Sequence, residues 1–210
     1  MDADIVVIGG GPAGLAAAAK AAEKNVNVLL LEREKELGGI LPQCIHMGFG
    51  NFVLGEMLTG PEYAHHYKKQ VNKKNICIKT GTMALEIQKD KTIIAINKTE
   101  GLLRIRPKAI ILAMGCRERT RNQILLPGSR PAGIYTAGSA QQLINVKGVM
   151  PGKNVVILGS GDVGLIMARR FLLEGATVQG VFEIMPNPGG LTRNLVQCLQ
   201  DYDIPLFLSH

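Results

Sequence analysis

The sequence predicts a three-layer α/β protein made of two similar units of parallel strands and helices, the first of which carries an inserted three-stranded antiparallel meander. Three observations support this fold class. Short apolar runs alternate with helical patterns, a glycine pattern near the N-terminus recurs 150 residues later, and glycine accounts for 25 of the 210 residues. Because an average protein has only about 7% glycine, this excess indicates turns in which the backbone itself approaches a ligand.

The first unit opens with an apolar strand, a glycine-rich turn and an alanine-rich helix. Residues 5–8 show no polar alternation, which is typical of a strand buried on both faces of a parallel sheet. We expect a helix over residues 15–25, with Pro12 in the first turn, where a proline is tolerated. Residues 26–31 form the second predicted strand, which ends at Glu32.

The turn between this strand and this helix has the spacing GxGxxG. Gly9 allows the tight turn, Gly11 lets the backbone approach a pyrophosphate, and Gly14 lets the helix pack on the strand. Glu32 lies 18 residues after Gly14, near the ~20 expected for an acid that accepts hydrogen bonds from ribose hydroxyls. Because these parts occur in order, we interpret the unit as Rossmann-like and dinucleotide-binding, rather than as an ordinary α/β unit with a glycine-rich turn.

A second unit repeats this order. Residues 155–158 form an apolar run, the predicted helix ends before Gly175, and residues 177–182 form a strand that ends in Glu183. A third strand is expected over residues 204–208. The glycines of the second turn each follow a glycine of the first by 150 residues: Gly159, Gly161 and Gly164. Two dinucleotides in one chain usually exchange electrons, so the layout predicts an oxidoreductase.

The stretch between the units begins with a glycine-rich segment, residues 38–60, which we expect to be a functional loop because structureless loops of this length are otherwise uncommon. An amphipathic helix is predicted over residues 61–74. Its apolar positions are Tyr63, Tyr67 and Val71, and lysines lie on its other side.

Short strands fill the rest of that stretch. Residues 76–78 indicate a third parallel strand, and residues 109–113 indicate a further buried strand. Between them, three runs separated by turn residues predict the antiparallel meander: 84–87, 92–96 and 102–105. Prolines with nearby glycines mark the crossing into the second unit: Pro107, Pro127, Pro131 and Pro151. We therefore expect two domains, residues 1–118 and 119–210.

Five motifs are spread over nearly the whole chain: GGGPAG at 9–14, Glu32-Arg33, Gly38-Gly39, Ala113-Met114-Gly115 and GSGDVG at 159–164. Together they resemble the two-dinucleotide flavoproteins that include the pyridine nucleotide–disulfide oxidoreductases. More narrowly, the segments GGILPQCIHMGFG, AMGCRERT and RPAGIYTAG resemble a bacterial branch without the redox cysteine pair. That branch is often paired with anaerobic glycerol 3-phosphate dehydrogenases and is related to flavoprotein subunits of amine-oxidising dehydrogenases.

This resemblance implies FAD in the first unit and a nicotinamide dinucleotide in the second, with hydride passing between them and electrons passing on to a partner dehydrogenase subunit or another acceptor. The residues implied for FAD are Gly9, Gly11, Pro12, Ala13, Gly14, Glu32, Arg33, Gly38, Gly39, Ile40, Met83 near the adenine, Ala113, Met114 and Gly115. The residues implied for the nicotinamide cofactor are Gly159, Ser160, Gly161, Asp162, Val163, Gly164 and Glu183.

The sequence departs from the family pattern in three ways. Disulfide reductases carry a second cysteine soon after the Gly-Gly, whereas Cys44 has none, so a dithiol mechanism is not expected. Met114 replaces a threonine, which removes a hydroxyl near the flavin but keeps a backbone contact from Gly115. The chain stops at His210, so we expect either a C-terminally truncated fragment or a second polypeptide that completes the fold.

Cys44 and His46 are the candidate catalytic pair in the glycine-rich segment. A Cys44 thiolate near an oxidised flavin could form a charge-transfer contact, and His46 could lower the pKa of that thiol or move protons. The alternative is a half-buried cysteine without chemistry. We predict no metal site, because two side chains are too few ligands. Cys77 and Cys198 occupy apolar positions that favour core packing, and Cys116 is ambiguous.

Glu183 bears on the choice of nicotinamide cofactor. A carboxylate at that strand end accepts from a ribose 2′-hydroxyl and repels a 2′-phosphate, and no arginine follows closely, so we predict NADH over NADPH. The alternative is a solvent-facing loop glutamate.

Composition narrows the class of protein. The chain has 24 Lys+Arg against 17 Asp+Glu, a net charge of +7, but the basic residues are spread out and no aromatic residues interleave them, so nucleic-acid binding is not expected.

A basic cluster lies around the crossing between the units: Arg117, Arg119, Arg121 and Arg130. These side chains either neutralise phosphates or an acidic partner, or make salt bridges with residues such as Glu118. The apolar start is too short for a membrane span, and four separated cysteines fit a reducing cytoplasm.

The sequence therefore favours an FAD-dependent NAD(P)H oxidoreductase that works with a partner subunit or as a homo-oligomer. Two alternatives stay open: a non-catalytic nucleotide-binding or assembly subunit, and an inactive fragment of the longer enzyme.

Overall fold

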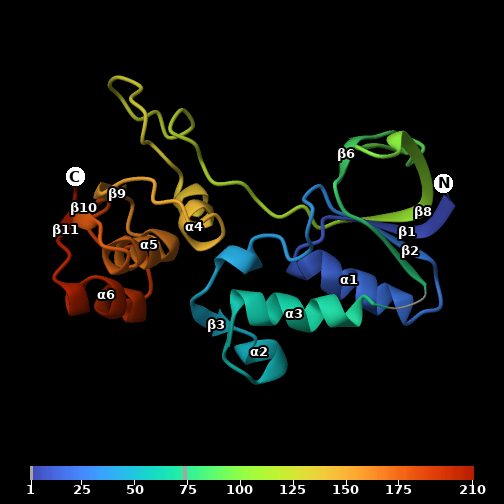
Figure 1. The fold of residues 1–210 in the computed structure, drawn as a ribbon, viewed down its shortest axis with the longest axis horizontal. Helices are drawn as coiled ribbons and strands as arrows, with labels where there is room; N and C mark the ends of the chain where they lie inside the picture. The colour runs from blue at the N-terminus through green and yellow to red at the C-terminus, as the bar shows by residue number, and fades with distance from the viewer. Residues whose placement is uncertain (1, 73–74) are drawn as a thin grey trace. The chain divides into compact units, whose positions relative to one another are not determined.

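The computed structural model describes residues 2–72 and 75–210 (Figure 1). The chain divides into two compact units, Met1–Arg117 and Glu118–His210. Both units are built on parallel strands with helices against them, so the predicted α/β class is confirmed. Each unit is described by itself.

The first unit holds a six-stranded sheet of order β5-β2-β1-β8-β7-β6. Four of these strands, β5, β2, β1 and β8, run parallel, and the meander of β6, β7 and β8 is antiparallel, both as predicted. The strand β1 therefore lies between β2, which follows it in the chain, and β8, which comes later in the chain. The bounds are β1 (Asp2–Ile8), β2 (Val28–Leu31), β5 (Ile76–Lys79), β6 (Thr82–Ile87), β7 (Ile93–Asn97) and β8 (Gly101–Leu112).

The strand β8 corrects the sequence prediction. Residues 102–105 and 109–113 were expected to be separate strands, but they belong to the single strand Gly101–Leu112. Its first part pairs antiparallel with β7, and its second part pairs parallel with β1 from Arg106 onward. Pro107 therefore lies inside a strand and does not mark the crossing between units. A proline has no N–H to donate, and this one sits where the strand changes partner.

The core of the first unit lies on both faces of the sheet. The helices α1 (Pro12–Ala22) and α3 (Gly60–Gln70) pack side by side on one face, where Val7 and Leu30 are fully buried. The meander covers the other face, where Val6 and Leu29 meet Ile93 and Ile105. Alternate residues of one strand thus face different layers, which explains the apolar run without polar alternation.

Both helices differ from prediction at their ends. The first begins at Pro12 instead of Leu15 and ends at Ala22 instead of Asn25, because Gly11 and Pro12 start it early and Asn25 has a positive φ of 56°. The second ends at Gln70, with Val71 as its C-cap, and the predicted end at Lys74 falls outside the described residues.

Residues 38–60 are only partly the predicted loop. They contain a 3₁₀ turn, η1 (Leu41–Gln43), then β3 (Met47–Phe49), the short helix α2 (Asn51–Leu54) and β4 (Leu58–Thr59). The two short strands pair antiparallel, so the backbone groups of this segment bond partly to each other.

The second unit has a parallel sheet of order β11-β10-β9. One core cluster joins the helices to this sheet through fully buried residues such as Leu165, Ala168 and Val181. The predicted third strand is shorter than residues 204–208, because the N–H of Ile204 donates to Leu199 and closes a turn. The bounds are α4 (Ala137–Asn145), β9 (Asn154–Leu158), α5 (Asp162–Leu173), β10 (Thr177–Glu183), α6 (Thr192–Cys198), η2 (Gln200–Tyr202) and β11 (Leu206–Leu208).

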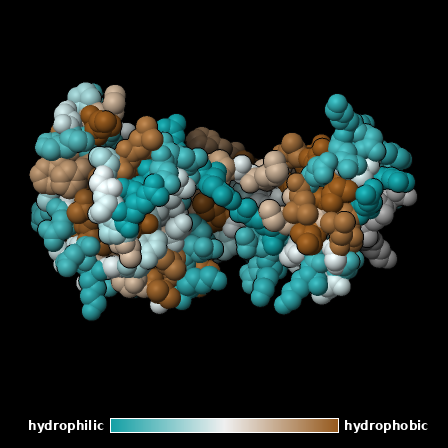
Figure 2. Space-filling view, turned by 90° about the horizontal axis from the view of Figure 1, so that it is seen from above, coloured by the Kyte–Doolittle hydropathy of each residue, from teal (hydrophilic) through white to brown (hydrophobic). Residues whose placement is uncertain are grey.

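Hydrophilic side chains are spread over the visible surface, interrupted by apolar patches (Figure 2). In the described part of the chain, no helix has the length and hydrophobicity that crossing a membrane requires. Cys198 is buried as predicted, whereas Cys77 is exposed because its strand β5 lies at the edge of the sheet, which corrects the expectation of core packing.

Candidate functional site

The first glycine turn lies at the carboxyl end of β1, at the point where the sheet order reverses between β2 and β8. The N–H of Gly9 donates to the carbonyl of Leu31 (2.8 Å), which ties the turn to the end of β2. A Cβ on Gly14 would collide with the carbonyl oxygen of Gly9, so only glycine lets α1 approach the turn this closely. Ala113 packs against the turn from the end of β8.

Glu32 lies at the end of β2 and is buried, and its carboxylate is bonded to the turn. Oxygen Oε2 accepts from the N–H of Gly10 at 2.6 Å, and Oε1 accepts from the N–H of Glu34 at 2.8 Å. Arg33, its neighbour, is exposed and pairs with Glu34. The acid predicted from spacing therefore stands directly beside the glycine turn.

The Gly38-Gly39 segment closes over the same turn. The N–H of Gly38 donates to the carbonyl of Gly10 at 2.8 Å, and a Cβ on Gly39 would lie 2.9 Å from the Cα of Gly11. The next residue, Ile40, is 56% exposed, and Met114 beyond β8 is 65% exposed. Both residues belong to segments that contact the glycine turn. Exposed apolar side chains next to such a turn are typical of a ligand-binding site.

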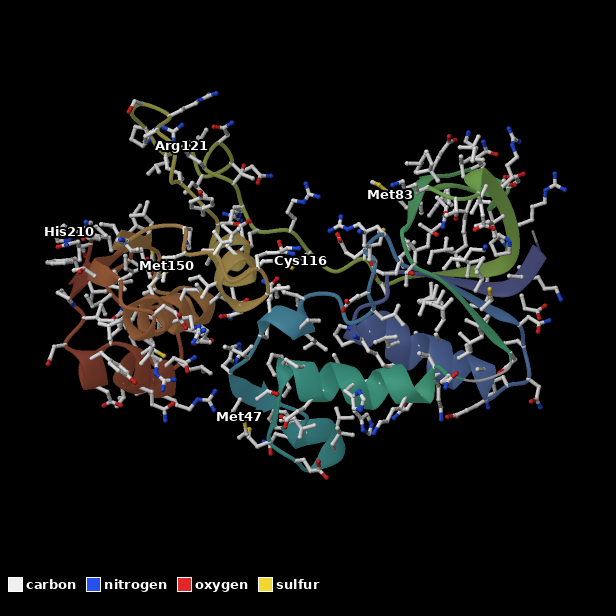
Figure 3. All side chains as sticks on the ribbon, viewed as in Figure 1. Met47, Met83, Cys116, Arg121, Met150 and His210 are labelled. Carbon is white, nitrogen blue, oxygen red and sulfur yellow. The ribbon has the colours of Figure 1, made fainter. Side chains whose placement is uncertain are left out.

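Two further predicted FAD residues adjoin this turn, since the N–H of Thr82, next to Met83, donates to the carbonyl of Glu32 at 2.8 Å, and Gly115 follows Met114. Met83 is on β6, in the meander, and its side chain is half exposed (Figure 3). Gly115 has a φ of 68° and follows the end of β8.

The N-terminus of α1 fits a pyrophosphate. Its N-cap, Gly11, makes no side-chain hydrogen bond, so the first-turn N–H groups of Ala13 and Gly14 have no side-chain cap among the described residues. The helix α3 differs, because Thr59 and Glu62 form a capping box there. An uncapped helix start beside a closely packed glycine turn and a ribose-type acid matches what a dinucleotide such as FAD needs.

The second turn repeats this geometry. The N–H of Gly159 donates to the carbonyl of Phe182 at 2.7 Å, as Gly9 does to Leu31, and a Cβ on Gly164 would lie 2.8 Å from the Gly159 oxygen. The N-cap of α5, Gly161, also lacks a side-chain hydrogen bond. The residues present therefore fit a second dinucleotide.

Glu183 is buried, so the solvent-facing alternative is wrong. Its Oε2 accepts from the hydroxyl of Ser160 at 2.6 Å and from the Ser160 N–H at 2.9 Å, and its Oε1 accepts from the Met185 N–H at 2.9 Å. The Ser160 hydroxyl first, and then the backbone N–H groups, lower the pKa of Glu183 to about 2. This carboxylate is thus ionised at neutral pH.

Asp162 has a role that motif spacing did not indicate. Its Oδ1 accepts from the N–H of Leu191 at 2.8 Å and from the side-chain amide of Asn194 at 2.7 Å. The hydroxyl of Ser160 accepts from the N–H of Gly189 at 2.8 Å. Two side chains of the turn therefore hold residues 189–194. The only signal in the sequence is the glycine pair at 189–190, where the chain passes close to the turn.

A cavity of about 970 Å³ opens beside the second turn, within the second unit. Gly159, Gly161 and Val163 line it from the turn, and Tyr135 and Thr136 line it before α4. This volume is within the range of cofactor sites.

Cys44 and His46 are less favourable for chemistry than expected. Cys44 is 8% exposed and donates to the carbonyl of Ile40, and burial raises the pKa of its thiol, which disfavours the thiolate. The Nδ1 atom of His46 lies 3.1 Å from the carbonyl of Met47, and its ring packs against Phe49. The two side chains thus point to different partners.

The arginine cluster has a structural component. Arg121, labelled in Figure 3, donates from Nη2 to the carbonyls of Pro127, Gly128 and Ser129, which closes the loop between them. Glu118 accepts from the N–H of Gly138 at the start of α4. No group of three or more His, Cys, Asp or Glu residues is placed to hold a metal ion in residues 2–72 and 75–210.

Comparisons with known proteins agree with this geometry. Residues 3–202 match the family described as pyridine nucleotide-disulphide oxidoreductase. Hydrogen cyanide synthase subunit HcnB of Pseudomonas protegens is 28% identical over 190 residues, which cover 87% of this chain and 39% of that protein. An opine oxidase subunit of Agrobacterium tumefaciens is 27% identical over 211 residues, which cover 93% of this chain and 40% of that protein. The chain spans about two fifths of the length of these relatives.

Among solved structures, the thioredoxin reductase of T. acidophilum matches with a TM-score of 0.71 and 24% identity, over 99% of this chain and 64% of that one. This likeness shows the fold.

Proposed function

The chain belongs to the pyridine nucleotide-disulphide oxidoreductase family, and on that basis we propose that it is an FAD-dependent oxidoreductase that exchanges electrons with NAD(H) and passes them to a partner subunit or another acceptor. One observation carries the proposal. Each unit has a buried acid at the end of its second strand that is bonded to the second residue of its glycine turn, as Glu32 is to Gly10 and Glu183 is to Ser160. Two such sites in one chain suit electron exchange between two dinucleotides.

The assignment of FAD to the first unit, for which the sequence predicts residues 1–118, is supported by how tightly that turn is covered. Gly38 and Gly39 pack directly on Gly10 and Gly11, which suits a cofactor that stays bound. In the second unit, for which the sequence predicts residues 119–210, Gly189 and Gly190 also pack on the turn, but a Cβ on Gly159 or Gly161 would meet nothing within 4 Å among the described residues. The part of the turn around Gly159 and Gly161 is therefore less covered, which suits a nicotinamide cofactor that exchanges during turnover.

The residues of the chain would bind and orient. The N–H groups at the start of α1 would hold the pyrophosphate of FAD, and Glu32 would accept from its ribose. Bound FAD would supply reversible hydride acceptance. Glu183 would face the ribose of the nicotinamide cofactor in the same way. No side chain need act as a nucleophile, since the protein supplies orientation and exclusion of water.

Glu183 supports NADH over NADPH as the nicotinamide cofactor. Its pKa of about 2 keeps the carboxylate ionised at every physiological pH. A fixed negative charge at that position repels a ribose 2′-phosphate.

The chemistry proposed is not dithiol exchange. Cys44 is the only cysteine in the segment after Gly38-Gly39, and its thiol is buried with a raised pKa. Electrons would instead leave toward a partner. The names of two relatives, a subunit of hydrogen cyanide synthase and a subunit of opine oxidase, support a partner subunit for this chain.

The visible spectrum of the purified chain, before and after NADH under anaerobic conditions, tests this function. We expect yellow protein that NADH bleaches. Colourless protein contradicts the proposal, and yellow protein that is indifferent to NADH supports a non-catalytic nucleotide-binding subunit instead.

A further inference from the structure

Ser160 is fully buried and joins three segments of the second unit. Its hydroxyl donates to Glu183 Oε2 at 2.6 Å, its N–H donates to the same oxygen at 2.9 Å, and its hydroxyl accepts from the N–H of Gly189 at 2.8 Å. The glycine turn, the end of β10 and the segment after it are therefore held together by one side chain.

The first unit has no equivalent of this hydroxyl. Its matching residue is Gly10, where a Cβ would lie 2.6 Å from the Leu37 side chain and 2.9 Å from the Glu32 carboxylate, so a serine there would require both side chains to shift. Glu32 is bonded to the turn through a backbone N–H alone. The first unit thus shows that a glycine turn and its acid can pair without a hydroxyl. The Ser160 hydroxyl is therefore an additional bond that is found in the second unit.

What Ser160 adds is a third short bond on the acid. An ionised carboxylate has about four acceptor positions. The Glu32 carboxylate accepts from Gly10 and Glu34, whereas Glu183 accepts from Met185 and from both donors of Ser160. Glu183 therefore has less freedom to turn aside and fewer positions left for a ribose hydroxyl.

The segment after Glu183 is fixed as well. Asp162 accepts from Leu191 and Asn194, and a Cβ on Gly190 would lie 2.9 Å from the Ser160 carbonyl oxygen. The backbone beside Glu183 is bonded to the turn through the N–H of Gly159, which donates to the carbonyl of Phe182 at 2.7 Å. The carboxylate is therefore restrained both by its own hydrogen bonds and by its backbone.

We propose that Ser160 is the positioning residue through which the second site rejects a 2′-phosphorylated dinucleotide. It holds the Glu183 carboxylate where a 2′-phosphate would have to lie, so that NADPH meets a negative charge that cannot move away. The inference rests on the proposed function, because it takes the second unit as the nicotinamide site.

The test measures dissociation constants for NADH and for NADPH by direct titration, without turnover. Removing a hydrogen bond to a charged group changes an equilibrium about tenfold or more, so Ser160→Ala should lower the preference for NADH over NADPH by about tenfold, mainly through tighter NADPH binding. Ser160→Thr keeps the hydroxyl and should retain most of the preference. Ser129→Ala, an exposed serine in the same unit, should leave both constants unchanged.

Ser160→Gly gives the same reading if the alanine variant folds poorly, because glycine occupies the matching position of the first turn. A merely structural serine would weaken both cofactors equally, and an unchanged ratio of the two constants in the alanine and glycine variants overturns the inference. A wild-type chain that binds neither dinucleotide contradicts the proposed function itself. Wild-type preference for NADH with an unchanged ratio in both variants overturns only the role of Ser160.

Discussion

The hydroxyl and the backbone N–H of Ser160 both donate to one carboxylate oxygen of Glu183, at 2.6 and 2.9 Å. The residues that correspond to them in the first unit, Gly10 and Glu32, make the backbone bond alone, at 2.6 Å. The two halves of the chain therefore reach the same arrangement of turn and acid with different side chains. Under the proposed function, this relationship would give each unit a preformed place for a ribose.

Glu183 should make the stability of the protein depend on pH in the acidic range. Its pKa is about 2, below the ordinary value of 4.5, so its contribution is complete above about pH 4.5 and is lost as the pH falls toward 2. Glu183→Gln should lower the free energy of unfolding at pH 7 by about 1–2 kcal/mol and remove part of the loss at low pH. Urea unfolding at pH 7, 4 and 3 measures both. An identical pH dependence in the two proteins would show that Glu183 does not contribute.

Gly14→Ala should be more damaging than Gly164→Ala. A helix gains about 1 kcal/mol from alanine over glycine, but a Cβ on Gly14 collides with the Gly9 carbonyl, whereas one on Gly164 lies 2.8 Å from the Gly159 oxygen. We expect the free energy of unfolding to fall by about 2–3 kcal/mol in Gly14→Ala and by less in Gly164→Ala. Gly152→Ala is the control, because a Cβ there meets nothing within 4 Å. Equal melting temperatures for all three variants would contradict the close approach.

Cys44 should react slowly with an alkylating agent at pH 7. Its thiol is buried and burial raises its pKa, whereas Cys77 and Cys116 are exposed. Peptide mapping after timed treatment with iodoacetamide should show Cys44 labelled at least about tenfold more slowly than Cys116, because the thiolate is the reactive form. Labelling of Cys44 at the rate of Cys116 would restore it as a candidate for chemistry.

Thr59→Ala should destabilise α3 without affecting the nucleotide sites. Thr59 and Glu62 form a capping box, and loss of such a cap costs about 1 kcal/mol. The Thr59 N–H, and then the Thr59 hydroxyl, lower the pKa of Glu62, so this contribution also disappears as the pH falls. Thermal unfolding should show the loss while flavin content stays constant. A loss of flavin in this variant would indicate that α3 supports the first turn more directly than proposed.

Local patterns predicted most of the elements. The apolar runs before Gly9 and Gly159, the glycine spacing and the terminal acids Glu32 and Glu183 are all consecutive in the chain, and each has a physical reason that needs no distant partner. These local patterns therefore predicted the strands, the glycine turns and the two acids, and in the structure each acid lies beside its turn.

Contacts between distant residues were not predictable in this way. The two runs on either side of Pro107 form one strand only because β7 pairs with its first part and β1 with its second. The bonds from Asp162 to Leu191 and Asn194 join residues about 30 apart, and no local pattern marks them. The burial of Cys44 and the exposure of Cys77 likewise depend on what packs over each side chain.

Anaerobic titration of Glu32→Gln and Glu183→Gln with NADH tests the central claim most directly, with bound flavin measured first by its absorbance. We expect Glu32→Gln to lose most of its flavin, while Glu183→Gln stays yellow but is bleached poorly by NADH. The reverse pattern, or equal flavin loss and equal bleaching in both variants, would contradict the assignment of the two dinucleotides to the two units.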